Sequence, residues 1–200
     1  MIKRIIIGPV ETNCYFLINE STEETVIFDP AYAGKKIADY VSDNGLKVKA
    51  ICLTHGHYDH IMGIKEFKEI YNVPVYACRE EEKLLGDGEL NHSSVHYDHA
   101  VTVKPDILLD DGEEFQTAGI KIKMIHTPGH THGSCCYYIK DMNMLISGDT
   151  LFEGSVGRTD LPTGSMSEMM RSLSDKLSEL PDDTDVYPGH GGYTRIGDEK

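Results

Sequence analysis

Four turns of the chain share one pattern, in which an apolar run is followed by a segment that combines glycine with histidine or aspartate. Apolar runs of this length are typical of buried strands, and a loop at a strand end presents its side chains to a cleft. A lone loop histidine is usually structural, but four such turns are hard to explain by packing. The pattern therefore predicts a site assembled from strand ends that are far apart in the sequence. The turns are residues 54–60, 127–130, 148–149 and 188–190, after the runs 48–53, 121–126, 144–147 and 184–187.

The first turn, THGHYDH, is the richest in side chains that bind metals. Imidazole and carboxylate ligands stand there at short spacing, and we expect Gly56 to let the backbone bend tightly enough for several to converge. Four ligands from one loop could hold one metal or be divided between two. These candidate ligands are His55, His57, Asp59 and His60.

The tetrapeptide HYDH occurs a second time, at residues 96–99, with no apolar run and no His-Gly pair before it. Because no strand end presents these side chains, we interpret His92, His96 and His99 as part of a loop that borders the active-site cleft. A contact between one of them and the substrate stays open.

Hydrophobic patterning predicts an α/β protein in one domain, residues 1–200. Each half is a set of strands followed by a helix, and no Gly-, Ser- or Pro-rich linker separates the halves, so we expect two packed sheets with helices outside. Residues 87–106 are the least regular stretch and the best candidate for a mobile loop. The expected strands are 2–7, 14–19, 25–28, 48–53, 75–78, 120–125, 134–139, 144–147 and 184–187, and the expected helices are 33–43, 61–70 and 165–180, the last from a Ser165–Glu168 capping box.

Composition narrows the classes of partner. Nineteen basic and 33 acidic residues give a formal charge of −14, which argues against nucleic acid and anionic membranes. No apolar run approaches the roughly 20 residues of a membrane span, and the N-terminus lacks a signal peptide, so we expect a cytoplasmic protein. The five cysteines are odd in number, and we interpret them as reduced, buried thiols. We expect the acid-rich stretches 79–83 and 181–183 to be solvated surface.

The chain resembles the metallo-β-lactamase-fold hydrolases over nearly its whole length. The resemblance implies an αββα sandwich of two mixed β-sheets with a dinuclear metal site at one edge. It implies that His55, His57 and His130 bind one metal, that Asp59, His60 and His190 bind the other, and that Asp149 bridges them. Asp59 and Asp149 are the expected catalytic carboxylates, and the expected cofactors are two divalent ions, zinc first, with iron or manganese as alternatives. The segments that carry the resemblance are ETNCY 11–15, FDP 28–30, THGHYDH 54–60, TPGHTHGS 127–134, SGDTLF 147–152, GRTD 157–160 and PGHG 188–191.

Within that family the chain is most similar to the compact glyoxalase II-like proteins, through GSVGRTDLP at residues 154–162. That similarity implies hydrolysis of a small-molecule thioester of the S-2-hydroxyacylglutathione type by a hydroxide shared between the metals. A thiolate leaving group, with a pKa near about 8.5, needs no dedicated general acid. Since ten residues follow His190, we expect no C-terminal glutathione-binding domain, and the thiol stays open. Arg158 is a candidate for binding a substrate carboxylate, with a salt bridge to Asp160 as the alternative.

Other functions remain compatible with the same residues. A persulfide dioxygenase would use one iron held by His55, His130 and Asp149. Lactone or phosphodiester hydrolysis could use the dinuclear centre, and a metal-binding protein without activity would keep the ligands alone. True β-lactamases place cysteine or serine at the position of Asp149 and are exported, which argues against them.

Overall fold

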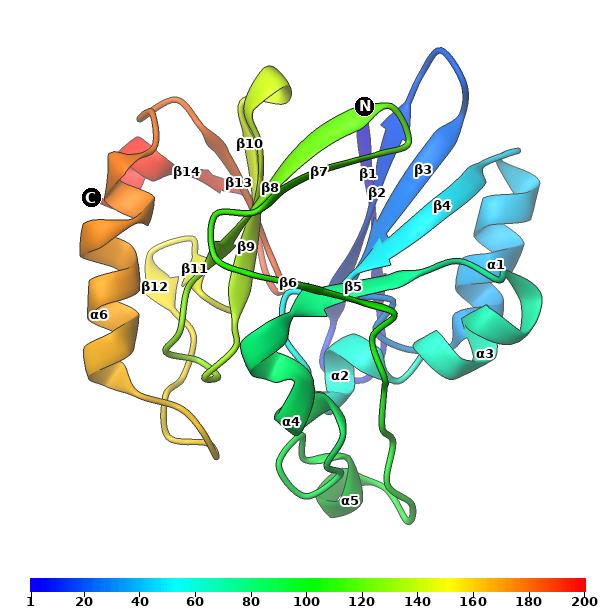
Figure 1. The fold of residues 1–200 in the computed structure, drawn as a ribbon, viewed down its shortest axis with the longest axis horizontal. Helices are drawn as coiled ribbons and strands as arrows, with labels where there is room; N and C mark the ends of the chain where they lie inside the picture. Colours follow the sequence, from blue (N-terminus) through cyan, green and yellow to red (C-terminus); the bar gives the residue numbers. More distant parts are fainter.

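Two six-stranded β-sheets face each other across the middle of the computed structural model, which describes residues 1–200 (Figure 1). Helices cover the outer face of each sheet, so the layers are αββα, as predicted. The first sheet has the order β1 (Ile2–Ile7), β2 (Thr12–Asn19), β3 (Glu24–Phe28), β4 (Lys47–Cys52), β5 (Val75–Cys78) and β6 (Ile107–Leu109). The second has the order β14 (Thr194–Arg195), β13 (Asp185–Pro188), β10 (Met144–Gly148), β9 (Cys135–Ile139), β8 (Ile120–His126) and β7 (Glu114–Thr117), and β11 (Leu151–Phe152) pairs with β12 (Ser155–Val156) in a separate hairpin.

Both sheets are mixed, which confirms the predicted fold class. Strands β1 to β3 are antiparallel and β3 to β6 are parallel, while in the second sheet only β10 and β13 pair in parallel. Strands β8, β10 and β13 all run in the same direction, since β9 is antiparallel to both of its neighbours. The three later turns therefore emerge at one edge of the second sheet.

Strand β2 shows why the sheets pack on both faces. Successive side chains of a strand point to opposite faces. Cys14, Phe16 and Ile18 pack toward the helices, whereas Tyr15 and Leu17 pack between the two sheets. All five are buried, and each large apolar side chain contributes about 1.5–3 kcal/mol by leaving water.

Helices α1 and α3 pack on the first sheet and α6 on the second (Figure 1). Helix α1 buries Ile37, Ala38 and Val41 on one stripe. Helix α6 begins at Ser165, whose side chain accepts a hydrogen bond from the Glu168 N–H, which is half of the predicted capping box. The helices are α1 (Gly34–Asp43), α2 (Tyr58–Ile61), α3 (Ile64–Ile70), α4 (Glu82–Leu85), α5 (Ser93–His96) and α6 (Met166–Asp175).

Two predicted helices are shorter in the structure. The expected helix 61–70 is divided into α2 and α3, because the Gly63 N–H bonds to the Pro30 carbonyl (3.0 Å). The last helix ends at Asp175 rather than near residue 180, and a 3-10 turn follows (Leu177–Glu179). There the Lys176 ammonium bonds to the His126 carbonyl (2.6 Å), which directs the chain back toward the second sheet.

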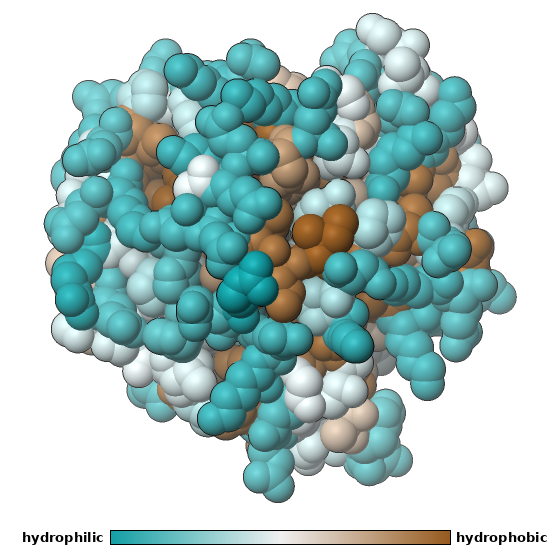
Figure 2. Space-filling model, in the orientation of Figure 1, coloured by the Kyte–Doolittle hydropathy of each residue, from teal (hydrophilic) through white to brown (hydrophobic).

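The five cysteines are buried and unpaired, as predicted. Cys135 packs between the sheets and Cys136 on the side of α6, so the adjacent thiols face opposite ways. The face seen in Figure 2 is mostly hydrophilic, with hydrophobic side chains in its recesses. None of the helices has the length and apolar character that crossing a membrane requires.

Candidate metal centre

The turns after β4, β8, β10 and β13 meet at one edge of the sandwich. All seven predicted ligands lie there, in three overlapping groups whose ligand atoms are within 4.8 Å of one another in each group. A cavity of about 380 Å³ opens on five of them, all except His55 and His60. The groups are His55, His57 and His130; His55, His60 and Asp149; and Asp59, His60 and His190.

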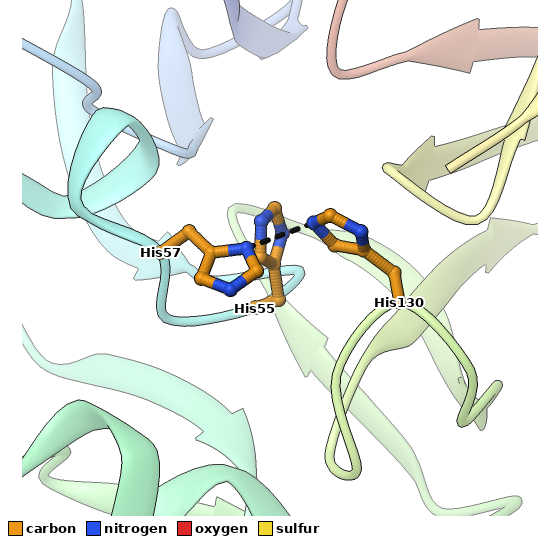
Figure 3. Close-up of side chains that lie close together, drawn as sticks. All are labelled: His55, His57 and His130. Atoms are coloured by element: carbon orange, nitrogen blue, oxygen red, sulfur yellow. Dashed lines mark hydrogen bonds between the residues drawn. The ribbon is translucent and has the colours of Figure 1, made fainter. Parts of the chain in front are cut away.

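The first group consists of three buried histidines that point toward one another from two loops (Figure 3). His57 Nδ1 and His130 Nε2 are 2.8 Å apart. The His130 ring donates from Nδ1 to the Arg158 carbonyl (2.7 Å), so the neutral ring keeps a lone pair on Nε2. The same holds for His55, whose Nδ1 lies 3.1 Å from Thr54 Oγ1, a hydroxyl that already donates its proton to Asp29. Both Nε2 atoms are thus prepared to bind a cation.

The group of Asp59, His60 and His190, called the second group from here on, is oriented in the same way, and the set His55, His60 and Asp149 overlaps both it and the first group. The His60 ring contacts the Asp29 carboxylate through Nδ1 (3.0 Å), and His190 donates from Nδ1 to the Val10 carbonyl (3.1 Å). The two Nε2 atoms therefore face the centre, 3.4 Å apart. Asp59 Oδ2 lies 3.2 Å from His190 Nε2 and completes the group.

Asp149 lies between the two groups. Its Oδ1 is 3.4 Å from His60 Nε2, and its Oδ2 is 3.6 Å from both His130 Nε2 and His190 Nε2. One carboxylate thus faces histidines of both groups. Two cations a few Å apart need such a shared anion to limit their repulsion.

Unpartnered polar atoms test whether these residues suit metal ions. His55 Nε2 and Asp149 Oδ1 are buried without a hydrogen-bond partner and face the centre, whereas His57 faces it through Nδ1 and its unpartnered Nε2 points away (Figure 3). Leaving a buried polar group unsatisfied costs about 1–3 kcal/mol, and a bound cation would remove that cost for atoms that face the centre. Imidazole with carboxylate is a donor set that suits zinc, iron or manganese. The residues present therefore fit a divalent metal centre.

Electrostatics of the cluster agree with this conclusion. Burial lowers the pKa of His55 well below its usual value and that of His57 to about 3, so both are neutral and able to bind metal. Burial alone would also lower the pKa of His60, but Asp149 and the other carboxylates outweigh it and raise that pKa. Burial raises the pKa of Asp149, but His60, His130 and His190 together outweigh burial and hold that pKa well below its usual value. The cluster therefore contains ionised carboxylates, whose negative charge favours the binding of a cation.

Residues outside the predicted ligand set position the turns. Asp29 Oδ1 accepts from the Thr54 N–H (2.8 Å), in addition to its contact with His60. Asn13 Nδ2 and the Tyr15 hydroxyl both donate to the Pro188 carbonyl (2.9 and 2.7 Å), which ties β2 of the first sheet to the turn that carries His190. These residues occur in the segments 11–15 and 28–30, but nothing in the sequence assigned them a role.

Glu81 corrects the expectation that residues 79–83 are solvated surface. It is 1% exposed and accepts from the Gly56 N–H (2.8 Å), the Gly133 N–H (2.9 Å) and the Thr131 hydroxyl (2.9 Å). Burial raises its pKa to about 7, although these donors oppose the shift. No sequence signal separates it from Glu80 and Glu82.

Gly56 has a different role from the expected one. Its φ is not in the left-handed region, so tight bending does not explain the residue. A Cβ at Gly56 would lie 2.8 Å from the side chains of Leu84 and Leu85. Glycine there allows α4 to approach the ligand-bearing turn.

The second HYDH lies partly at the site. His92 and His96 line the cavity, and the His96 ring stacks on Tyr58 with ring centres 4.4 Å apart. His99 is exposed and pairs with Asp98 (2.8 Å), away from the cavity. The prediction that these three histidines border the cleft is therefore confirmed for His92 and His96 and not for His99.

Arg158 lines the cavity as well, but its guanidinium forms two hydrogen bonds with Asp160, both of 2.7 Å. The alternative interpretation, a structural salt bridge, is thus the arrangement observed. The Arg158 carbonyl, rather than its side chain, contacts the site through His130.

The fold and the ligand groups define a protein of the metallo-hydrolase class. A sequence model of the Metallo-beta-lactamase superfamily matches residues 7–190, and the chain belongs to that superfamily. Proteins of this superfamily are metal-dependent, and the chain is a metal-dependent hydrolase by family.

Two relatives align over nearly the whole chain. The Bacillus subtilis protein called probable metallo-hydrolase YqgX is 40% identical, with 97% of this chain and 92% of the relative covered. The hydroxyacylglutathione hydrolase GloC of Haemophilus influenzae is 30% identical, with 100% and 94% covered.

Two solved structures are also similar. One is the BLEG-1 B3 metallo-beta-lactamase, with a TM-score of 0.93, 38% identity, and 99% of this chain and 95% of that chain covered. The other is TTHA1623 in a di-iron-bound form, with a TM-score of 0.86, 31% identity, and 98% and 96% covered.

Proposed function

We propose that the protein hydrolyses thioesters of the S-2-hydroxyacylglutathione type at a dinuclear metal centre. One observation carries the proposal: Asp149 faces histidines of two separate ligand groups at the base of a cavity of about 380 Å³. The similarity to a hydroxyacylglutathione hydrolase over the full chain supports the choice of substrate.

The first metal would be held by His55, His57 and His130, and the second by Asp59, His60 and His190, with Asp149 shared. When bound, two divalent ions lower the pKa of a shared water from about 15.7 toward about 7 and polarise the substrate carbonyl. Contacts of Nδ1 with Asp29, Val10 and Arg158 keep the rings of His60, His190 and His130 oriented with Nε2 toward the centre. A thiolate leaves without a proton from any side chain.

Zinc is the metal that we propose, and iron is the main alternative. The di-iron-bound form of TTHA1623 supports a dinuclear centre in a protein with 31% identity. The contact between Asp59 and His190 (3.2 Å) supports two metals over one, since a mononuclear dioxygenase site of His55, His130 and Asp149 would leave this second group unused.

A substrate panel tests the proposal. Metal-stripped protein is reconstituted with zinc, manganese or iron and assayed on an S-2-hydroxyacylglutathione thioester, a lactone, a bis-phosphodiester and glutathione persulfide. We expect the thioester to be turned over fastest with two metals per chain, and Asp149→Ala to lower kcat by at least about 100-fold. Exposed Asp198→Ala is the control. Undiminished thioester turnover in Asp149→Ala, or one iron with oxygen uptake on persulfide, would contradict the proposal.

β-Lactam hydrolysis is a second candidate, favoured by the similarity to BLEG-1. A chromogenic β-lactam in the same panel separates the two. If its kcat/KM exceeds that of the thioester, the substrate class proposed here is wrong while the dinuclear centre stands.

A further inference from the structure

A short segment that follows β5 of the first sheet, the 3-10 turn Arg79–Glu81 with helix α4, packs against two ligand-bearing turns. Glu81 is the only one of its side chains that bonds to both turns. It does not line the cavity and belongs to none of the ligand groups. Both of its oxygens are used: Oε1 accepts from the Gly56 N–H (2.8 Å) and Oε2 from the Gly133 N–H (2.9 Å), and the single Thr131 hydroxyl proton is shared between them (2.9 and 3.0 Å).

The partners of Glu81 are next in sequence to ligands of the first group, and none is next to Asp59, His60 or His190. Gly56 lies between His55 and His57, and Thr131 follows His130. Those histidines come from different sheets, because one turn follows β4 and the other follows β8. A backbone bond from Cys135 N to Thr54 O (2.8 Å) also joins the turns, but at their base. Glu81 joins them next to the ligands.

The site favours a carboxyl group over an amide. All partners donate, so an acceptor is required on each branch of the side chain. A glutamine would turn its NH₂ toward either the Gly56 or the Gly133 N–H, and that N–H would lose its acceptor. A buried N–H without a partner is unfavourable, so the turns would have to move apart or rotate.

We propose that Glu81 is a positioning residue that sets the distance between His55 and His57 on one sheet and His130 on the other. It acts on the first metal site and not on the second. The inference rests on the dinuclear centre of the proposed function but is independent of the substrate.

Zinc affinity measured in two backgrounds tests this selectivity. Asp59→Ala keeps the three histidines of the first group, and His57→Ala keeps Asp59, His60 and His190. We expect Glu81→Gln to weaken zinc binding about 10–100-fold in the Asp59→Ala background, and less than about twofold in the His57→Ala background. Competition with a chromogenic chelator gives both values without any substrate.

Glu82→Gln is the matched control, since Glu82 is the next residue along and is exposed. Glu81→Asp keeps the carboxylate and should recover part of the lost affinity, which a purely space-filling role does not predict. If Glu81→Gln fails to fold, Thr131→Val removes one donor from the same network and should weaken the first site in the same direction.

Equal loss in both backgrounds would show a general structural role and overturn the inference. So would unchanged affinity in both. If neither parent background binds zinc, the dinuclear centre itself is wrong, and the inference is refuted with it. Absence of thioester turnover with normal, site-selective zinc binding would instead contradict only the proposed substrate.

Discussion

Replacement of Asp29 by asparagine should disable the second metal site through the orientation of His60. Asp29 is 2% exposed, and its Oδ2 accepts from the Thr54 hydroxyl (2.7 Å) and contacts His60 Nδ1 (3.0 Å). With Oδ1 still accepting from the Thr54 N–H, asparagine places an NH₂ where Oδ2 was. That NH₂ cannot accept the His60 Nδ1–H. His60 must then carry its proton on Nε2, the atom that faces the centre.

The expected cost follows from the lost contact. A hydrogen bond to a charged group contributes about 1.5–3 kcal/mol. At about 1.4 kcal/mol for each factor of ten, this corresponds to a loss of roughly 10–100-fold in metal affinity, which is the usual effect of changing a residue that orients a ligating histidine. The second site should be affected through His60, and the first site should be affected as well, because Asp29 Oδ2 fixes the Thr54 hydroxyl that accepts from His55 Nδ1. The second site is therefore measured by itself.

The assay is a zinc titration with chelator competition, on the His57→Ala background to isolate the second site. Asp39→Asn, the same change on the exposed side of α1, is the control and should leave affinity unchanged. The reasoning is refuted if Asp29→Asn binds zinc at the second site with the parent affinity while remaining folded by circular dichroism.

Three further predictions concern other parts of the molecule. A Cβ at Gly189 would lie 2.1 Å from Asp149 Oδ1, so Gly189→Ala should lower zinc affinity at least about tenfold in chelator competition, and an unchanged affinity would count against it. His92 lines the cavity, so His92→Ala should raise the thioester KM about 3–10-fold with kcat within about twofold; a fall in kcat alone would argue against a substrate contact. Burial raises the pKa of Asp106, but Lys68 (2.7 Å) and a backbone N–H outweigh it and hold that pKa below its usual value. The ionised form of Asp106 therefore stabilises the fold above about pH 4, and this contribution is lost as the pH falls through the folded-state pKa. Asp106→Asn should lower the free energy of unfolding by about 0.5 kcal/mol at pH 7 in urea titrations. A difference between the two proteins that persists at pH 2 would contradict this.

The turns that carry the candidate ligands could be predicted from the sequence because they depend on local features. A short apolar run forms a strand that is buried between the layers, and the turn after that strand lies at the edge of the sheet. The contacts that orient the ligands depend on tertiary approach and could not be predicted. Glu80, Glu81 and Glu82 are alike as a sequence, and only the position of the 3-10 turn against two sheets selects Glu81 for burial. The break at Gly63 likewise depends on Pro30, which is far away in the chain.

Each ligand group draws on both sheets, and this explains why so many buried polar residues surround the site. His55 and His57 approach from the first sheet and His130 from the second, while Asp59 and His60 approach from the first and His190 from the second. The geometry of both groups therefore depends on the relative position of the two sheets. Apolar packing alone does not fix that position closely, because side chains of similar volume are exchangeable at small cost. Directional hydrogen bonds between the two sheets fix their relative position more closely at the site. Glu81 provides them on the side of the first group, and Asn13 with Tyr15 on the side of the second.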